Sequence, residues 1–292
     1  MKVLVFGRSG QVARSLLERG AKTDHDVTAL GRPELDLTVP ETLDRALEDA
    51  APDVAINAAA YTAVDAAETE EAAAFAVNAT GAGNLAASCA AKDVPLIHIS
   101  TDYVFDGSLD RPYRETDPIA PQSAYGRSKA AGEAAVMGAG GEALIVRIAW
   151  VYSPFGQNFV KTMLRVGGER DHLRVVGDQR GNPTSALDVA DALFALSKTK
   201  ARGGWPTGVT PVHMAASDEA TWYEFACAIF DASPLEPKVD CITTADYPTP
   251  ARRPANSRLD CSYLEEQFQL SLPPWRESLM KVLEHLLSTR AQ

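Results

Sequence analysis

Residues 2–13, KVLVFGRSGQVA, decide the fold. The short β-branched apolar run predicts a buried strand over Lys2–Phe6, and a helix is predicted to begin directly after the glycine-rich turn. In the spacing Gly-x-x-Gly-x-x-Ala, Gly7 permits a tight turn, Gly10 lets the backbone approach a pyrophosphate, and Ala13 allows close helix–strand contact. Amides at the helix N-terminus can then hold phosphates. The turn therefore predicts dinucleotide binding, with contacts at Gly7, Arg8, Ser9, Gly10, Gln11 and Val12.

Strand and helix patterns alternate after this turn. Further apolar runs predict strands at Val27–Leu30, Asp53–Asn57, Pro95–Ser100 and Ala143–Ile148. Between them, helices are predicted at Gln11–Arg19, Glu41–Asp49, Ala66–Val77 and Ala79–Ala91. Alternation of this kind is typical of a parallel sheet covered on both faces. We therefore expect an α/β fold of the Rossmann type, with a doubly wound parallel sheet.

The pattern loosens after about Trp150, which indicates a second, smaller lobe. Strands are predicted at Arg174–Gly177 and Val209–Ala215, helices at Ala186–Ser197 and Thr221–Asp231, and a long loop at Tyr247–Arg258. We expect residues 1–150 to form the dinucleotide-binding domain and residues 151–292 to form mainly a C-terminal substrate-binding lobe. Because such lobes often return strands to the first sheet, the two parts are expected to interleave.

Composition excludes several functional classes. The 292 residues carry a net charge of −11, whereas coating nucleic acid or an anionic membrane needs a basic surface. No apolar run approaches the ~20 residues that a membrane span requires. The four cysteines and five histidines form no cluster with metal-ligand spacing, so no metal site is expected. We expect a cytoplasmic protein that binds neither nucleic acid nor membrane.

The choice of cofactor should appear at the end of the second strand, where an acidic residue favours NAD and an arginine accommodates the 2′-phosphate of NADP. The chain has Arg32 there, and no carboxylate before Glu34. NADPH is therefore the expected cofactor, with NADH possible as well and Arg8 as a second phosphate ligand. Asp36 and Leu37 are expected to border the adenine, and Ala58, Ala59 and Ala60 to form a small-residue ledge beside the cofactor.

Tyr125 and Lys129 carry the clearest chemical signal. Residues four apart share a helix face, so the phenol and the ammonium should point the same way. A nearby cation favours the phenolate and should lower the tyrosine pKa toward the working range of a proton donor. Thr101 follows the fourth predicted strand, at the sheet edge where ligands bind, and would complete a Thr–Tyr–Lys triad.

With these motifs in order, the sequence resembles the extended short-chain dehydrogenase/reductase superfamily and, within it, the dTDP-4-dehydrorhamnose reductases. The resemblance spans essentially the whole chain. Beyond the glycine turn and the triad, it rests on residues 31–37, 100–105, 147–152, 158–160, 181–184 and 253–259.

The resemblance implies an enzyme of dTDP-rhamnose biosynthesis, an oxidoreductase that reduces the C4 ketone of dTDP-4-dehydro-L-rhamnose to dTDP-L-rhamnose with NADPH. It implies that Tyr125 donates a proton to the C4 oxygen, Lys129 holds the nicotinamide ribose, and Thr101 hydrogen-bonds the developing alkoxide. Implied contacts with the dTDP-sugar are Asp102, Tyr103 and Trp150, together with Asn256 and Arg258 in the second lobe.

One position departs from the family pattern. Some members carry a glutamate in the first helix as part of a magnesium-bridged dimer contact, and here that position is Ser15. Because a hydroxyl is a poor ligand for a hard cation, no structural magnesium is expected there, and monomer and homodimer both remain open.

Two alternative functions remain. The same scaffold serves sugar-nucleotide epimerases and dehydratases, of which epimerases recycle their cofactor without net oxidation. The regulatory β subunit of methionine adenosyltransferase, a binding module, also has this fold.

Overall fold

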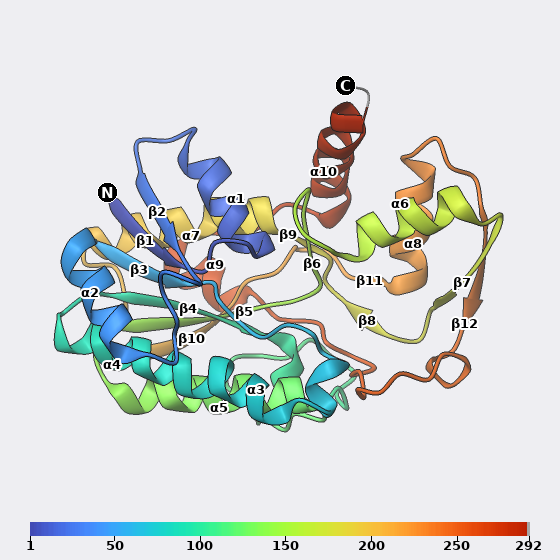
Figure 1. The fold of residues 1–292 in the computed structure, drawn as a ribbon. Helices are drawn as coiled ribbons and strands as arrows, with labels where there is room; N and C mark the ends of the chain where they lie inside the picture. Colours follow the sequence, from blue (N-terminus) through green and yellow to red (C-terminus); the bar gives the residue numbers. More distant parts are fainter. Residues whose placement is uncertain (291–292) are drawn as a thin grey trace.

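A six-stranded parallel sheet forms the centre of the computed structural model, which describes residues 1–290 (Figure 1). The strand order is β2-β1-β3-β4-β5-β10, and every neighbouring pair is parallel. The strands are β1 (Lys2–Phe6), β2 (Asp26–Leu30), β3 (Val54–Asn57), β4 (Leu96–Thr101), β5 (Ala143–Ile148) and β10 (Val209–His213). The first five predicted strands are thus confirmed to within a residue or two, and the sixth comes from the second half of the chain.

Both faces of the sheet are covered by helices, as the alternating pattern predicted. Side chains of β1 alternate between the faces, so that Val3 and Val5 join one apolar cluster while Leu4 and Phe6 join another. On the first face pack α1 (Gln11–Gly20), α7 (Ala186–Ala201) and α9 (Ser262–Phe268), and on the second α2 (Pro40–Ala50), α4 (Ala82–Ala91) and α5 (Ala124–Ala139) (Figure 1). The doubly wound Rossmann-type fold is confirmed.

The helical region before β4 differs from the prediction of separate helices at Ala66–Val77 and Ala79–Ala91. A 3-10 turn, η1 (Ala66–Glu68), precedes α3 (Glu71–Phe75), and the π-helical segment η2 (Ala76–Gly81) joins α3 to α4. The wide turn places Asn78 where its side-chain amide binds both Tyr61 backbone groups and Ser128 Oγ. The chain therefore stays helical from α3 through η2 to α4, where the prediction placed a break between two helices at Asn78.

The second lobe has its own apolar core, in which Phe225, Ile229 and Val282 are fully buried. Its helices are α6 (Phe159–Glu169), α8 (Trp222–Asp231) and α10 (Trp275–Arg290). Its paired strands are β7 (His172–Val176) with β12 (Lys238–Ile242), β6 (Val151–Tyr152) with β9 (Thr184–Ser185), and β8 (Arg180–Gly181) with β11 (Ala220–Thr221). The chain also contains two 3-10 turns, η3 (Asp102–Val104) after β4 and η4 (Thr244–Asp246) after β12. The helix predicted at Thr221–Asp231 is confirmed, except that Thr221 caps it, accepting a hydrogen bond from Glu224 N.

The two parts interleave. Strand β10 returns from the second half to pair with β5, and α7 packs on the same face of the sheet as α1. None of the helices within residues 1–290 is long and apolar enough to cross a membrane.

Candidate active site

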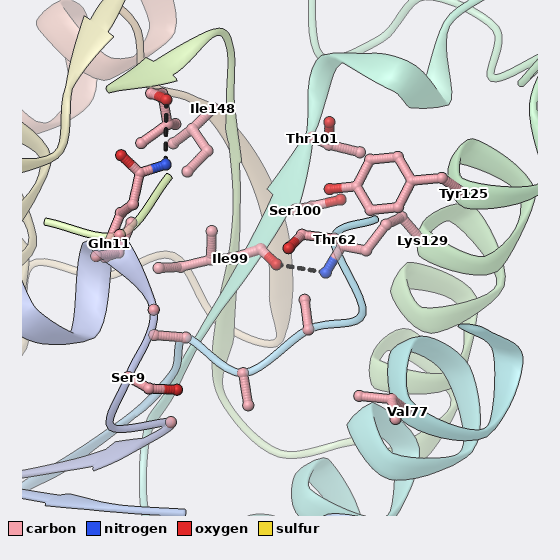
Figure 2. A pocket seen from close by; sticks show the side chains of 18 of the residues that line it. Ser9, Gln11, Thr62, Val77, Ile99, Ser100, Thr101, Tyr125, Lys129 and Ile148 are labelled. Carbon is pink, nitrogen blue, oxygen red and sulfur yellow. Dashed lines mark hydrogen bonds between the residues drawn. The ribbon is translucent and has the colours of Figure 1, made fainter. Parts of the chain in front are cut away.

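A cavity of about 720 Å³ lies at the carboxyl ends of β1–β5, where the second lobe meets the sheet. It extends from the glycine turn through the Tyr125 region to Trp150 and Trp222. Figure 2 shows the glycine-turn side, with Ser9 and Gln11, facing Tyr125 and Lys129 across the cavity. The cavity therefore joins the glycine turn to the Tyr125 region and to the second lobe.

The glycine turn has the backbone that a dinucleotide site requires. Gly7 has a φ of 115°, and a Cβ there would come within 2.9 Å of Ala59 N. Within residues 1–290, no side chain caps the N-terminus of α1, so its first amides stay available beside the cavity. A Cβ on Gly10 would meet nothing closer than Ala58 O at 3.9 Å, which leaves open space for a phosphate against the turn. These features fit a pyrophosphate, and the predicted residues Gly7–Val12 all line the cavity.

Beside the turn, the arginines predicted to select the cofactor line the same cavity. Arg8 pairs with Glu34 at 2.7 Å, and Arg32 lies 4.0 Å from Asp36. The Arg32 side chain is 72% exposed, so a phosphate at the rim can reach its guanidinium. Asp36, Leu37 and the ledge Ala58–Ala60 also lie on the cavity wall.

Helix α5 carries the phenol and the amine to the end of β4. Ser123 caps the helix by accepting a hydrogen bond from Gly126 N at 3.1 Å. A Cβ at position 126 would lie 2.3 Å from Tyr103 O, so only glycine lets the first turn of α5 pack this closely on η3. That close packing brings Tyr125 beside Thr101, with both side chains pointing into the cavity (Figure 2).

The hydrogen bonds of the triad are specific. Thr101 Oγ1 donates to Asp102 Oδ1 at 2.9 Å and accepts from Tyr103 N at 3.2 Å. Lys129 Nζ donates to Ile99 O at 2.7 Å, as Figure 2 shows. The structure therefore brings the three predicted catalytic side chains together in the cavity, between the glycine turn and the two tryptophans.

Burial dominates the protonation of these groups. It raises the pKa of Tyr125 to about 12, opposed by a hydrogen bond with Thr101, and lowers the pKa of Lys129 to about 8. The prediction that Lys129 lowers the tyrosine pKa is therefore wrong in this structure, because loss of water around the phenol outweighs other influences and the amine is bound to the Ile99 carbonyl. A phenol that stays protonated at neutral pH is still suited to donate a proton.

The residues predicted on the sugar side also line the cavity. Burial raises the pKa of Asp102 to about 6, against hydrogen bonds from Ser257 and Thr101 that lower it. Trp150 has a φ of 45°, a strained conformation for a large side chain, and its Nε1 donates to Ser257 Oγ at 3.0 Å. Its indole stacks on that of Trp222, with centroids 3.5 Å apart.

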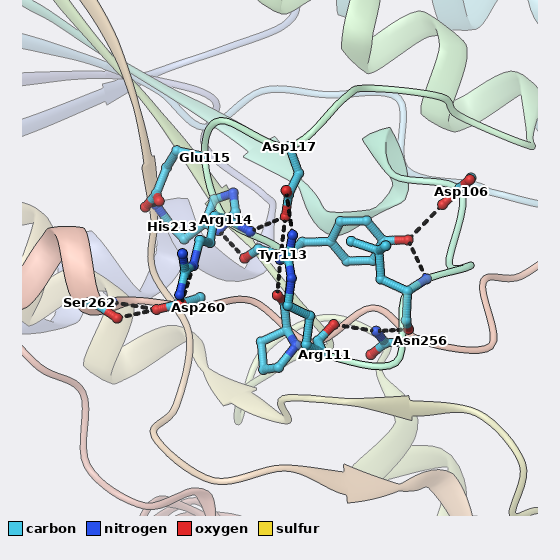
Figure 3. Close-up of polar contacts among 12 residues, drawn as sticks. Asp106, Arg111, Tyr113, Arg114, Glu115, Asp117, His213, Asn256, Asp260 and Ser262 are labelled. Carbon is cyan, nitrogen blue, oxygen red and sulfur yellow. Dashed lines mark hydrogen bonds and ion pairs between the residues drawn. The ribbon is translucent and has the colours of Figure 1, made fainter.

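Asn256 and Arg258 lie outside the cavity, contrary to the substrate contacts expected of them. Asn256 Nδ2 donates to the carbonyls of Leu109 and Arg111, and Figure 3 shows Asn256 directed at Arg111. Arg258 binds Glu219 at 2.6 Å and the Asp110 carbonyl. Both side chains are buried and used in holding loops together, so this geometry gives them a structural role.

Several cavity residues were not predicted. Trp222 reaches the cavity from α8, and no local pattern marks it because its partner Trp150 is distant in sequence. The remaining unpredicted residues are Gly31, Leu35, Thr62, Val64, Val77, Ile99, Ser100, Ile148, Val151, Gly156 and Gln157. Gly31 directly follows β2, and Ile99, Ser100 and Ile148 lie at the C-terminal ends of β4 and β5. These residues could have been found, because ligands bind at the carboxyl ends of parallel strands.

The fold and the Thr–Tyr–Lys arrangement define the class, a Rossmann-type reductase of the extended short-chain dehydrogenase/reductase superfamily. A sequence profile for the RmlD substrate binding domain matches residues 1–288. The chain belongs to this family, the family of the dTDP-4-dehydrorhamnose reductases, and the resemblance noted in the sequence is confirmed.

Known relatives agree over nearly the full length. The chain is 45% identical to the dTDP-4-dehydrorhamnose reductase of Sinorhizobium fredii, over 98% of each chain, and 46% identical to that of Burkholderia thailandensis, over 99% of this chain and 100% of the relative. Among solved structures, a dTDP-4-dehydrorhamnose reductase from Bacillus anthracis in complex with NADP superposes with a TM-score of 0.91, at 33% identity over 97% of this chain and 99% of that one. The corresponding enzyme from Clostridium acetobutylicum gives the same TM-score at 36% identity, over 98% of this chain and 100% of that one.

Proposed function

We propose that this protein reduces the C4 ketone of dTDP-4-dehydro-L-rhamnose to dTDP-L-rhamnose, with NADPH as the reductant. One observation carries the proposal: Tyr125, Lys129 and Thr101 line one cavity, between the glycine turn and the tryptophans Trp150 and Trp222. Relatives at up to 46% identity are dTDP-4-dehydrorhamnose reductases, and a similar structure holds NADP.

When bound, the reduced nicotinamide supplies the hydride that attacks the ketone carbon. Tyr125 donates its hydroxyl proton to the C4 oxygen, and a pKa of about 12 keeps the phenol protonated until negative charge develops on that oxygen. Thr101 donates a hydrogen bond to the same oxygen once it turns from Asp102. Lys129 orients the nicotinamide ribose, and its pKa of about 8 suits it to pass a proton at neutral pH.

The remaining cavity residues divide between the two ligands. Gly7, Arg8, Ser9, Gly10, Gln11 and Val12 hold the pyrophosphate, Arg32 binds the 2′-phosphate, Asp36 and Leu37 border the adenine, and Ala58, Ala59 and Ala60 support the cofactor from below. On the sugar side, Asp102 and Tyr103 bind hydroxyl groups, and Trp150 packs on the sugar face. Residues 1–150 thus act as the dinucleotide-binding domain and residues 151–292 mainly as the substrate-binding lobe.

The residues that the proposal uses all belong to one chain, and the proposal covers a monomer or a homodimer. All four cysteines are free thiols in the described structure, which is consistent with work in the cytoplasm.

The test is absorbance of reduced nicotinamide after dTDP-4-dehydro-L-rhamnose is added to the protein and NADPH. We expect one NADPH to be consumed per sugar nucleotide, with Tyr125→Phe as the inactive control. Conversion of the sugar without net NADPH oxidation would indicate an epimerase instead. Absence of any turnover, together with co-purification of a larger catalytic partner, would indicate a regulatory subunit.

A further inference from the structure

A buried chain of polar groups runs beneath the cofactor ledge to Lys129. Asn57 ends β3, and His98 lies opposite it in the parallel pairing of β3 with β4. Asn57, His98 and Lys129 are each no more than 2% exposed. Because no polar group at this depth can turn to bulk water, the partners of each one fix its orientation.

The orientation of the Asn57 amide follows from its neighbours. Its Oδ1 accepts a hydrogen bond from Ala59 N at 3.2 Å, so its Nδ2 faces His98 Nδ1 at 3.0 Å. An amide nitrogen can only donate, and therefore His98 Nδ1 must accept. Burial and the charge of Lys129 hold the pKa of His98 well below its usual range, so the ring is neutral and carries its one proton on Nε2.

That proton faces the catalytic amine. His98 Nε2 lies 3.5 Å from Lys129 Nζ, while Nζ also donates to Ile99 O at 2.7 Å. A neutral amine in this position accepts from His98 Nε2–H and donates to Ile99 O, so all partners are satisfied. If Lys129 is an ammonium instead, the His98 Nε2–H dipole points at a positive charge, which disfavours the charged form of the lysine.

We propose that Asn57 and His98 form a pair of positioning residues that lower the proton affinity of Lys129 by presenting it with a donor rather than an acceptor. In the proposed reduction, this lets the lysine release a proton toward Tyr125 near neutral pH. That consequence rests on the proposed function, whereas the ring tautomer and the lysine titration do not.

Other charged groups around Lys129 do not replace this pair. Glu133, one turn along α5, favours the ammonium, but its carboxylate is bound by Arg147 and by Ser100 Oγ. Tyr125, one turn earlier on the same face, is protonated at neutral pH. Three elements packed against α5 also carry titratable groups. From η3, Asp102 and Tyr103 lie beside Tyr125. From η1, Glu68 accepts a hydrogen bond from Ala124 N, and from α3, Glu71 pairs with Arg127.

The tautomer can be read without any substrate. Two-bond proton–nitrogen correlation spectra of protein labelled with 15N-histidine distinguish Nδ1–H from Nε2–H, and the His98 signals are assigned by their loss in His98→Gln. We expect the Nε2–H tautomer, with no titration between pH 6 and 9. An Nδ1–H tautomer, or a ring that titrates in this range, would overturn the proposal.

Asn57→Asp tests the effect on the lysine. One carboxylate oxygen can still accept from Ala59 N, while the other accepts from His98 Nδ1, which moves the ring proton and turns Nε2 into an acceptor. The Lys129 titration, followed by 13Cε shifts of labelled lysine, should move upward by about one pH unit or more. The alkaline limb of kcat/KM against pH should move with it.

The matched control is Asn57→Asp in the His98→Gln background, which keeps the added charge and removes the imidazole. We expect a smaller upward shift there than in the single variant. Equal shifts, or none in the single variant, would mean that His98 does not act on the lysine. Since NADPH consumption is measured separately, failure of the proposed function would leave these titration results standing.

Discussion

Replacing Lys129 with methionine should stabilise the protein while abolishing its activity. The folded protein buries this ammonium to 2% exposure and lowers its pKa from 10.5 to about 8. At about 1.4 kcal/mol per pH unit, the buried charge costs about 3 kcal/mol at pH 7. Methionine has a similar length and removes that cost, but it leaves Ile99 O without its donor, a loss of about 1 kcal/mol. The net expectation is about 2 kcal/mol of added stability.

The stability gained by Lys129→Met should depend on pH, because the pKa of the lysine differs between the folded and unfolded states. Below pH 8 the lysine is charged in both states, so the wild type bears the full penalty. Between pH 8 and 10.5 the folded lysine loses its proton before the unfolded one, and the penalty disappears. The advantage of Lys129→Met should therefore be largest at pH 7, and above pH 10.5 the variant should be less stable than the wild type by about 1 kcal/mol, because the hydrogen bond to Ile99 O is lost.

Urea unfolding of both proteins at a series of pH values measures this advantage. Lys22→Met, at an exposed lysine paired with Glu18, is the control and should change stability by less than about 0.5 kcal/mol. A Lys129→Met protein that is less stable than the wild type at pH 7, or an advantage that does not change with pH, would refute the reasoning.

Three further variants test other parts of the site. Tyr125→Phe should fold and bind NADPH normally but lose about 10²–10⁴-fold in kcat, because it lacks the proton donor; near-normal turnover would contradict this. Arg32→Ala should raise the KM for NADPH about tenfold and leave that for NADH unchanged, since only NADPH carries the 2′-phosphate; an equal change for both would remove the assigned role. Glu133→Gln should cost about 3–5 kcal/mol in urea unfolding, because it leaves Arg147 buried at 1% exposure without its carboxylate. Its control, Glu71→Gln at the exposed pair with Arg127, should cost less than about 1 kcal/mol.

Local pattern was sufficient for the sheet and for the nucleotide end. The strand over Lys2–Phe6 and the glycine turn depend on nearest neighbours in sequence, and the structure reproduces both. The Tyr125–Lys129 pair depends on helix geometry alone, and it too lies where the spacing placed it.

Features that depend on distant contacts could not be obtained in this way. The π segment Ala76–Gly81 follows from Asn78 binding the Tyr61 backbone and Ser128. The raised pKa of Tyr125 follows from how much chain covers it, which spacing does not reveal.

The same limit applies to the second lobe. Arg258 was expected to contact the dTDP-sugar, because nothing local shows that Glu219 and the Asp110 carbonyl already bind it. Trp222 enters the cavity only because α8 packs against Trp150.

The central claim is hydride transfer from NADPH to the sugar C4 with Tyr125 as the acid. Its most direct test uses NADPH that carries deuterium at both hydrogens of nicotinamide C4, followed by mass spectrometry and proton NMR of the product. We predict dTDP-L-rhamnose with one deuterium, bound to C4, and one oxidised cofactor per sugar. A product without deuterium, or with deuterium at another carbon, would contradict the claim.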